Sequence, residues 1–343
     1  MTPRGGEKPA RRAVGIRDVA REAGVSVTLA SFALNGRGGV ADATRERILA
    51  TADSLGYRAN PHAQALRSGR STIYGLVVRN LSNPFFLDVI SGAEDVAHDA
   101  GATLLVVDSD YSQERERQHI ERLAGYRVGG LAIAPVGTGE SVRFWQKLCP
   151  DLPTVVVNAT AEGIDGVSRV SPDSRQAVEL PVQRLAELGH REIAFLSAPE
   201  ALMADSDRLR QFRTSARRLG VKPHVVRTPL NLEAVRNATL KLLRGPRRPT
   251  ALITNSDFTA YAVYKAAREL GVTVGSELSV VGHDDLPTSE LLDPPLATLR
   301  LDRRAMGRAL MTRLLEDGSP ADHQQHVELV ERASMGPPPA RDH

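Results

Sequence analysis

Short apolar runs alternate with segments of helical length over most of the chain after residue 72. Seven such runs are IYGLVV, ATLLVVD, GGLAIAP, TVVVN, EIAFLS, TALIT and LSVVGHDD. The helical-length segments between or beside them include 112–125, 174–188, 205–219, 231–244 and 258–270. This alternation is typical of βαβ units, because a parallel strand pair needs a long crossover connection. We therefore predict an α/β body with parallel sheets.

Basic charge is concentrated in the first fifth of the 343-residue chain. Residues 1–70 contain twelve Lys and Arg against six Asp and Glu, a net charge of +6, and the rest contains 32 against 35, a net charge of −3. A small basic module on a larger, slightly acidic body indicates a head that binds nucleic acid. A solvated basic tail accounts for residues 1–14, but it does not account for the patterned stretch that follows.

Three short helices are predicted in that stretch, residues 15–58. Apolar and small residues recur at helical spacing up to Gly24, a turn residue that ends the first helix, and Ser26 is a good N-cap for the second. One face of the second helix holds Ala30, Ala33 and Leu34, and the other holds Val27, Thr28, Ser31 and Phe32. A third helix over 42–55 is predicted to point Ile48, Leu49, Ala52 and Leu55 inward. The pattern is typical of a small, all-α helix-turn-helix module.

The chain resembles the LacI family of bacterial transcriptional regulators. Six motifs in family order carry the resemblance: IRDVAREAGVSVTLASFALNG, TRERIL, LGYRANPHAQALRSGRS, GLVVRNLSNPFF, ELGHREIAFLSAP and SVVGHDD. They lie between Ile16 and Ser334, nearly the whole chain. The resemblance implies a helix-turn-helix head, a hinge helix over 59–70, a flexible tail over 335–343 and, over 71–334, a periplasmic-binding-protein-like body. This α/β body is expected to consist of two parallel-sheet lobes.

Function follows from the resemblance as an expectation. Such a protein is a sequence-specific regulator, most often a repressor, that binds double-stranded DNA as a homodimer at a near-palindromic operator. A small polar metabolite between the two lobes switches its affinity. The hinge helices pair in the minor groove, where a leucine wedges into the central base step. In this chain those positions are Ala63 and Leu66.

The second helix raises a question about how the head reads DNA. Typical family members carry a long polar side chain where this chain has Phe32. Thr28 can donate a hydrogen bond, and Val27 can contact a thymine methyl group, as Phe32 can. Phosphate contacts are expected from Arg17, Ser31 and Asn35. The alternative is that Phe32 packs into the core of the head.

The predicted effector site gathers Arg208 and residues that follow strands, because ligands of open parallel sheets bind outside the carboxyl ends of the strands. By resemblance, Asp284, Arg208 and Asn158 contact the effector, and Phe85 or Phe86 stacks on it. The full predicted set is Phe85, Phe86, Asp110, Asn158, Arg208, Ser256, Asp257 and Asp284. A Ser-Asp pair stands at 256–257 where an Asn-Asp pair is usual, so an amide that would bond a sugar hydroxyl is lost at Ser256. A sugar or sugar-like polyol is the first hypothesis for the effector, and a nucleobase is the second.

Several other classes of protein are disfavoured. The chain has no Gly-rich phosphate loop, no G-x-S-x-G turn and no H-E-x-x-H motif, so we expect no enzyme, no cofactor and no metal. The single cysteine, Cys149, is expected to be a small apolar residue without a chemical role. No apolar run approaches the length of a membrane helix, and the first residues do not form a signal peptide. We therefore expect a cytoplasmic protein. The runner-up, a solute-binding protein of a transport system, would carry a signal peptide and lack residues 16–70.

Overall fold

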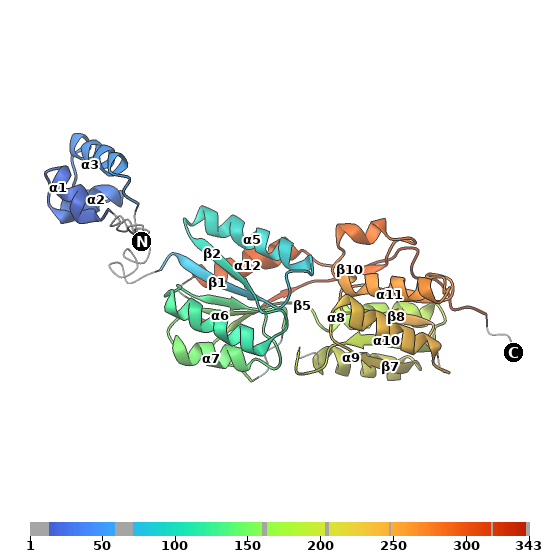
Figure 1. The fold of residues 1–343 in the computed structure, drawn as a ribbon. Helices are drawn as coiled ribbons and strands as arrows, with labels where there is room; N and C mark the ends of the chain where they lie inside the picture. Colours follow the sequence, from blue (N-terminus) through green and yellow to red (C-terminus); the bar gives the residue numbers. More distant parts are fainter. Residues whose placement is uncertain are drawn as a thin grey trace, which may run out of the picture. The chain divides into compact units, whose positions relative to one another are not determined.

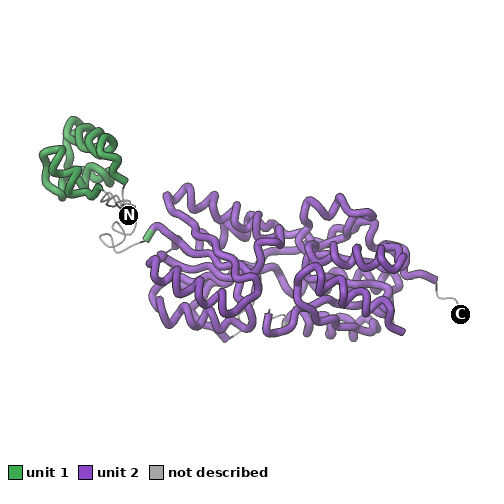
Figure 2. The backbone as a smooth tube through the Cα atoms, in the orientation of Figure 1, with its two compact units in different colours: residues 1–71 green, residues 72–343 purple. Residues whose placement is uncertain are grey.

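The computed structural model describes residues 14–58, 71–159, 163–202, 206–246, 248–316 and 318–340. The chain divides into two compact units, residues 1–71 and 72–343 (Figure 2). All but the last residue of the expected basic tail, 1–14, and the whole expected hinge helix with Ala63 and Leu66 lie outside the described residues.

The head consists of three helices, α1 (Ile16–Glu22), α2 (Val27–Leu34) and α3 (Asp42–Ser54) (Figure 1). Its core is made mostly of small side chains, Val19, Ala20, Ala23, Ala30, Ala33, Ile48 and Ala52. Alanines at a helix crossing let the backbones approach closely, so a small module can bury its core with little apolar volume. The Ser26 hydroxyl caps α2 by accepting a hydrogen bond from the backbone N–H of Leu29 at 3.1 Å.

One prediction for the head was wrong. Ile48 and Ala52 are buried and Leu55 packs against the core, but the side chain of Leu49 is 45% exposed. Consecutive helical residues point roughly 100° apart, so Leu49 cannot share the inward direction of Ile48.

The first lobe of the body has a parallel six-stranded sheet in the order β11-β5-β4-β3-β1-β2. Its strands are β1 (Ile73–Val78), β2 (Thr103–Asp108), β3 (Leu131–Ile133), β4 (Thr154–Val157), β5 (Ser168–Pro172) and β11 (His323–Gln325). Helices α5 (Phe85–Asp99) and α12 (Arg303–Leu315) cover one face, and α6 (Gln113–Gly125) and α7 (Glu140–Leu148) cover the other (Figure 1). Each face has its own buried apolar cluster, which explains why the strands read as nearly continuous apolar runs.

The second lobe repeats this plan with the parallel sheet β7-β6-β8-β9. The strands are β6 (Glu192–Ser197), β7 (Lys222–Arg227), β8 (Ala251–Ile253) and β9 (Ser279–Val281). The helices α8 (Gln176–Glu187) and α9 (Ser206–Arg218) pack on one face, and α10 (Leu232–Arg244) and α11 (Asp257–Glu269) pack on the other.

The chain passes between the lobes three times, after β5, before α12 and after β11. A short 3-10 helix, Pro287–Leu291, follows β9, and β10 (Thr298–Arg300) then pairs antiparallel with β12 (Glu328–Val330) next to these crossings. The passages place the carboxyl ends of both parallel sheets on either side of one space. The α/β architecture predicted from the sequence is confirmed.

Helices α5 and α12 cross at two glycines. A Cβ atom at Gly92 would lie 2.1 Å from the carbonyl oxygen of Arg304, and one at Gly307 would lie 2.0 Å from the carbonyl oxygen of Val89. Glycine costs helix stability, but here it allows two backbones to touch. The crossing fixes the start of α5, which carries Phe85, relative to the start of α12.

The end of the second lobe extends beyond the boundary expected at residue 334. Met335 packs against the apolar cluster under α8 and α9, and the carbonyl oxygen of Gly336 lies 2.9 Å from Nε2 of the buried His190. A second nitrogen of the same ring lies 2.8 Å from the Thr250 hydroxyl. A tail beginning at 335 is therefore wrong, because two of its residues are held by the lobe.

Cys149 is half-buried and packs beside the apolar cluster under α7. None of the helices in the described ranges combines the length and the apolar character that spanning a membrane requires.

Candidate functional site

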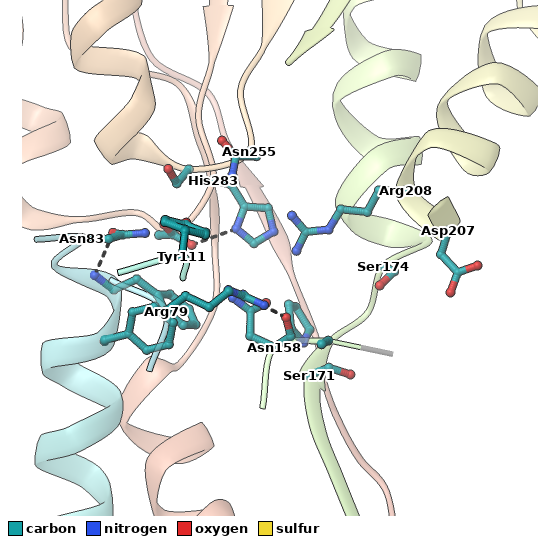
Figure 3. A pocket seen from close by; sticks show the side chains of 16 residues that line it. Arg79, Asn83, Tyr111, Asn158, Ser171, Ser174, Asp207, Arg208, Asn255 and His283 are labelled. Atoms are coloured by element: carbon teal, nitrogen blue, oxygen red, sulfur yellow. Dashed lines mark hydrogen bonds and ion pairs between the residues drawn. The ribbon is translucent and has the colours of Figure 1, made fainter. Parts of the chain in front are cut away.

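A pocket in the body is lined by sixteen residues from both lobes (Figure 3). Six of the eight predicted effector residues line it: Phe85, Phe86, Asn158, Arg208, Ser256 and Asp284. They come from the loops after β4, β8 and β9 and from helices α5 and α9. The strand-end rule therefore located the pocket, because both sheets present their carboxyl ends to it.

Three lining residues have left-handed backbone conformations just after a strand. The φ angle is 55° at Tyr111, 50° at Asn158 and 119° at Asp284. Such values are uncommon for residues other than glycine, and they cluster at functional sites. They turn the chain sharply at the sheet edge and bring these side chains to the pocket.

Phe85 and Phe86 form the apolar wall. Their rings meet edge to face with centroids 5.1 Å apart, and the residues are 1% and 2% exposed. Both also belong to the apolar cluster between α5 and the sheet. An aromatic pair anchored in this way offers a rigid surface to a ligand.

Asp284 is a charged residue of the pocket that is almost completely buried, with 4% of its surface exposed. Its Oδ1 lies 2.9 Å from Nδ1 of His283, and among the described residues Oδ2 has no hydrogen-bond partner of good geometry. Burial raises the pKa of Asp284 to about 8, although Arg303 and Arg208 both favour the ionised form. The group is therefore able to donate a hydrogen bond as well as to accept one near neutral pH.

Two predicted effector residues do not line the pocket. Asp110 is exposed, and its carboxylate pairs with Arg115 at 3.2 Å. Asp257 lies beneath the pocket, fully buried, where it accepts hydrogen bonds from Leu286 N–H at 2.8 Å, Ser289 Oγ at 2.6 Å and Thr298 Oγ1 at 2.5 Å. Burial raises the pKa of Asp257 to about 7. Asp110 and Asp257 were both assigned to the effector for the same reason, namely their position after a strand. A carboxylate at such a position can hold the loop by hydrogen bonds or an ion pair as readily as it can bind a ligand.

Ser256 serves the fold and lines the pocket. Its hydroxyl accepts a hydrogen bond from Thr259 N–H at 3.2 Å and so caps α11. The amide that we considered lost at this position is supplied one residue earlier, because Asn255 lines the pocket. Its side-chain oxygen accepts a hydrogen bond from the Thr259 hydroxyl at 2.9 Å, which orients the amide.

The sequence reasoning missed further lining residues: Arg79, Asn83, Tyr111, Ser171, Ser174, Asp207, Asn255 and His283. Arg79 directly follows β1, so the strand-end rule applied to it as well. It is only 3% exposed, and its guanidinium donates to the carbonyl oxygen of Asn158 at 3.1 Å and to that of Pro135 at 3.4 Å. Its position directly after an apolar strand could have indicated from the sequence that Arg79 lines the pocket.

The exposed side of α2 has the composition expected from the sequence. Val27 is 43% exposed, Thr28 is exposed, and Phe32 is half-buried without belonging to the core of the head. The guanidinium of Arg37 lies 6.0 Å from the centre of the Phe32 ring. These observations favour the interpretation in which Phe32 faces outward over the one in which it fills the core.

Ser31 and Asn35 lie one turn apart at the end of α2. The Asn35 amide donates to the carbonyl oxygen of Ser31 at 2.7 Å and to its hydroxyl at 3.2 Å. Arg17 is exposed on α1. Arg45, which the sequence reasoning did not single out, ties α3 to the end of α2 by donating to the carbonyl oxygens of Ala33 and Arg37 at 3.1 and 2.6 Å.

Comparison with known proteins gives two matching families. Residues 15–60 match the bacterial regulatory proteins of the lacI family, and residues 182–335 match a periplasmic binding protein-like domain. The transcriptional regulator MalR of Streptomyces coelicolor is 32% identical over 340 residues, covering 94% of this chain and 97% of MalR. The transcriptional repressor PurR of Photobacterium profundum is 27% identical over 328 residues, covering 93% of this chain and 98% of PurR.

A solved structure agrees with these relatives. The lac repressor dimer bound to operator and the anti-inducer ONPF superposes with a TM-score of 0.82 at 26% identity, covering 95% of this chain and all of that one. The relatives named here are regulators of transcription and not enzymes.

Proposed function

The chain belongs to the lacI family of bacterial regulatory proteins, and on that premise we propose that it represses transcription from a near-palindromic operator, which it binds as a homodimer. A small polar metabolite in the pocket between the lobes changes the operator affinity. The observation that carries the proposal is the pocket itself, to which both lobes contribute polar side chains around an aromatic wall.

The geometry suggests how ligand binding reaches the rest of the body. Arg303 starts α12 in the first lobe and donates to the backbone carbonyl oxygens of Asp284 and Asp285 in the second. It also pairs with Asp88 on α5 at 2.7 Å. A ligand that bonds both lobes favours the arrangement in which these contacts are made. Its different affinity for the two lobe arrangements is the source of the switch.

The head is proposed to read the operator through α2. Thr28 supplies a hydrogen bond, Val27 and Phe32 supply apolar contact with thymine methyl groups, and Arg17, Ser31 and Asn35 contact phosphates. Residues 59–70 are proposed to form the hinge helix, with Ala63 beside the wedge residue Leu66. Sequence preference then comes from apolar contacts and from DNA deformability more than from bidentate hydrogen bonds.

The pocket favours a hydroxylated ligand, a sugar or a close relative. Amides of Asn83, Asn158 and Asn255 and hydroxyls of Ser171 and Ser174 line it, and such groups both donate to and accept from ligand hydroxyls. Phe85 and Phe86 supply a surface for the apolar face of a ring. The proposed contacts also include Arg208, Ser256 and Asp284.

One experiment tests the operator and the pocket together. Preferred sites are selected from a random DNA pool with the full chain, and a metabolite panel is then screened for release of the selected site. Arg208→Ala and Asp284→Ala should abolish the response to the active metabolite but leave operator affinity without it unchanged. Arg213→Ala is the matched control, because Arg213 lies on the same helix, is exposed and does not line the pocket. If both pocket variants respond fully to the metabolite, the proposed effector site is wrong. If no DNA sequence is enriched from the random pool, the proposed function as an operator-binding repressor is wrong.

A further inference from the structure

One peptide group links a buried carboxylate to an arginine of the pocket. The carbonyl oxygen of Pro135 accepts a hydrogen bond from Nη1 of Arg79 at 3.4 Å. The adjoining N–H of Val136 donates to both carboxylate oxygens of Glu116, at 2.9 Å and 3.2 Å. This C=O and this N–H belong to the same peptide bond, which lies in the loop after β3. The peptide therefore has a guanidinium at its oxygen and a carboxyl group at its nitrogen.

Glu116 is placed to act on the pocket without touching its ligand. The residue is fully buried on α6 and lines a second cavity, of about 470 Å³, beside α7, whereas Arg79 lines the pocket between the lobes. Burial raises the pKa of Glu116 to about 7, and the negative charge of Glu140 on α7 also raises it. The hydrogen bond from Val136 and the positive charge of Arg79 act in the opposite direction. The charge on Glu116 therefore changes near neutral pH.

We propose that Glu116 is a positioning residue for the effector pocket, which holds the guanidinium of Arg79 in place through the 135–136 peptide. The proposal rests on the proposed function of the pocket and deepens it. A carboxylate that accepts from a peptide N–H makes the carbonyl oxygen of that peptide a better acceptor, because hydrogen bonds in a chain polarise one another. Arg79 also donates to the carbonyl oxygen of Asn158, another lining residue, at 3.1 Å. Ionised Glu116 therefore prepares the pocket for its ligand better than protonated Glu116 does.

Selective isotope labelling observes this peptide in the full chain. With carbonyl-¹³C proline and ¹⁵N valine, NMR detects only the amides of valines that follow a proline, and the sequence contains two, Val136 and Val182. Val182 lies inside α8 and serves as the internal control. We expect the signals of the Val136 N–H and the Pro135 carbonyl to move with pH around a midpoint near 7. In Glu116→Gln these signals should stay fixed over the same range.

Arginine variants test whether Arg79 is the other end of the link. Arg79→Gln removes a positive charge that favours ionised Glu116, so the midpoint of the Val136 signal should rise by about one pH unit. Arg117→Gln is the matched control and should move it far less, because Arg117 follows Glu116 on α6 but is exposed to solvent and does not line the pocket. Equal midpoints in Arg79→Gln and Arg117→Gln would overturn the proposal. If Arg79→Gln does not fold, Arg79→Lys replaces the forked donors by one ammonium group, and an unmoved Pro135 carbonyl signal would then overturn it.

The functional measurement uses the metabolite that releases the operator in the panel described above. Glu116→Gln should weaken the affinity for it about two- to tenfold at pH 8, where wild-type Glu116 is ionised, and change it little at pH 6. Operator affinity without the metabolite should be the same in both proteins. An equal metabolite response at pH 8, or Val136 signals that do not titrate, would overturn the proposal. If no metabolite is active but the Val136 midpoint responds to Arg79→Gln, the proposed effector site fails, whereas the link between Glu116 and Arg79 is confirmed.

Discussion

The head and the body present their ligand-facing side chains in opposite ways. On α2 of the head these are short or apolar and largely exposed, as at Val27 and Thr28. Around the pocket of the body they include charged groups that are almost completely buried, as at Arg79 and Asp284. DNA is densely charged along its backbone, so the DNA-facing surface of the head needs few polar side chains that are held rigidly in place. A small molecule, in contrast, binds tightly only when the polar side chains that contact it are already held in the right positions.

The contrast extends to the cores beneath the two surfaces. The head is held together mainly by alanines and single aliphatic residues, with few buried polar atoms. The loops of the pocket depend on buried polar residues such as Asp257, which joins the start of α11 by three hydrogen bonds to the 3-10 helix Pro287–Leu291 with its N-cap and to β10. Substitutions at the pocket are therefore expected to change stability, whereas substitutions on the exposed side of the head are expected to change preference.

The largest effect is expected for Asp257→Ala. Removing this carboxylate leaves three buried donors without their acceptor, which should lower the free energy of unfolding of the body by about 3–5 kcal/mol. Urea unfolding followed by the fluorescence of Trp145, the only tryptophan of the chain, measures it. Asp207→Ala is the control and should cost roughly 0.5 kcal/mol, because its ion pair with Arg210 is at the surface. If Asp257→Ala lowers the free energy of unfolding by less than about 1 kcal/mol, the pocket does not depend on buried polar groups more than the head does.

A second prediction concerns pH. Burial raises the pKa of Glu116 to about 7, where its carboxylate accepts from Val136 N–H at 2.9 Å. The folded state then binds a proton that the unfolded state has already lost, so stability falls as the pH rises from the ordinary glutamate pKa to about 7. The loss should be on the order of 2 kcal/mol.

Glu116→Gln tests this pH dependence. The variant should lose less stability than wild type between pH 5 and pH 8, measured by the same tryptophan fluorescence. Part of the slope should remain, because burial also raises the pKa values of Asp257 and Asp284. Identical slopes in the two proteins would show that Glu116 does not titrate in this range.

Phe32→Arg should change preference and leave the fold intact. Since Phe32 lies outside the core of the head, an arginine there should reach the major groove and favour guanine at the facing position by roughly 1–3 kcal/mol. Site selection from a random pool, with the helix content measured in parallel, gives the result. A head that unfolds would place Phe32 in the core after all, and an unchanged site would leave recognition to Thr28 and DNA shape.

The smallest effect is expected for Leu49→Ala. Its side chain is 45% exposed, so operator affinity measured by fluorescence anisotropy should stay within about twofold of wild type. Ile48→Ala, one residue earlier and fully buried, should weaken binding through loss of the head fold. Equal losses would mean that the two positions do not differ as their burial suggests.

The sequence predicted the architecture well, because apolar period and strand-end position are local properties. The parallel sheets and the three head helices followed from these patterns, whereas the six pocket residues followed from strand-end position together with the family resemblance, on which Arg208 depended. The sequence could not separate ligand-facing carboxylates from loop-holding ones. Asp257 and Asp284 both follow strands, and only their three-dimensional partners distinguish them. Arg79 was missed for a related reason, since an arginine after a strand is usually a solvated surface residue.

The exposure of Leu49 and the burial of Met335 against the second lobe depend on tertiary contacts, which the periodicity of apolar residues in the sequence does not predict. The apolar face of an amphipathic helix spans a broad arc, so several neighbouring residues can be predicted to point inward. Which of them is buried depends on where the neighbouring helix packs. A Pro- and Gly-rich end suggests a loose tail, but His190 and the apolar cluster hold its first residues.

The glycine crossing of α5 and α12 has a consequence for how such a regulator can diversify. Every amino acid other than glycine would force the two backbones apart at Gly92 or Gly307, and with them the helix starts that flank the pocket. The partly exposed lining positions, such as Asn158 and Ser171, have no such restriction, because their side chains border the pocket. Descendants of this chain could thus acquire new ligands by single exchanges around the pocket, while two interior positions remain closed to mutation.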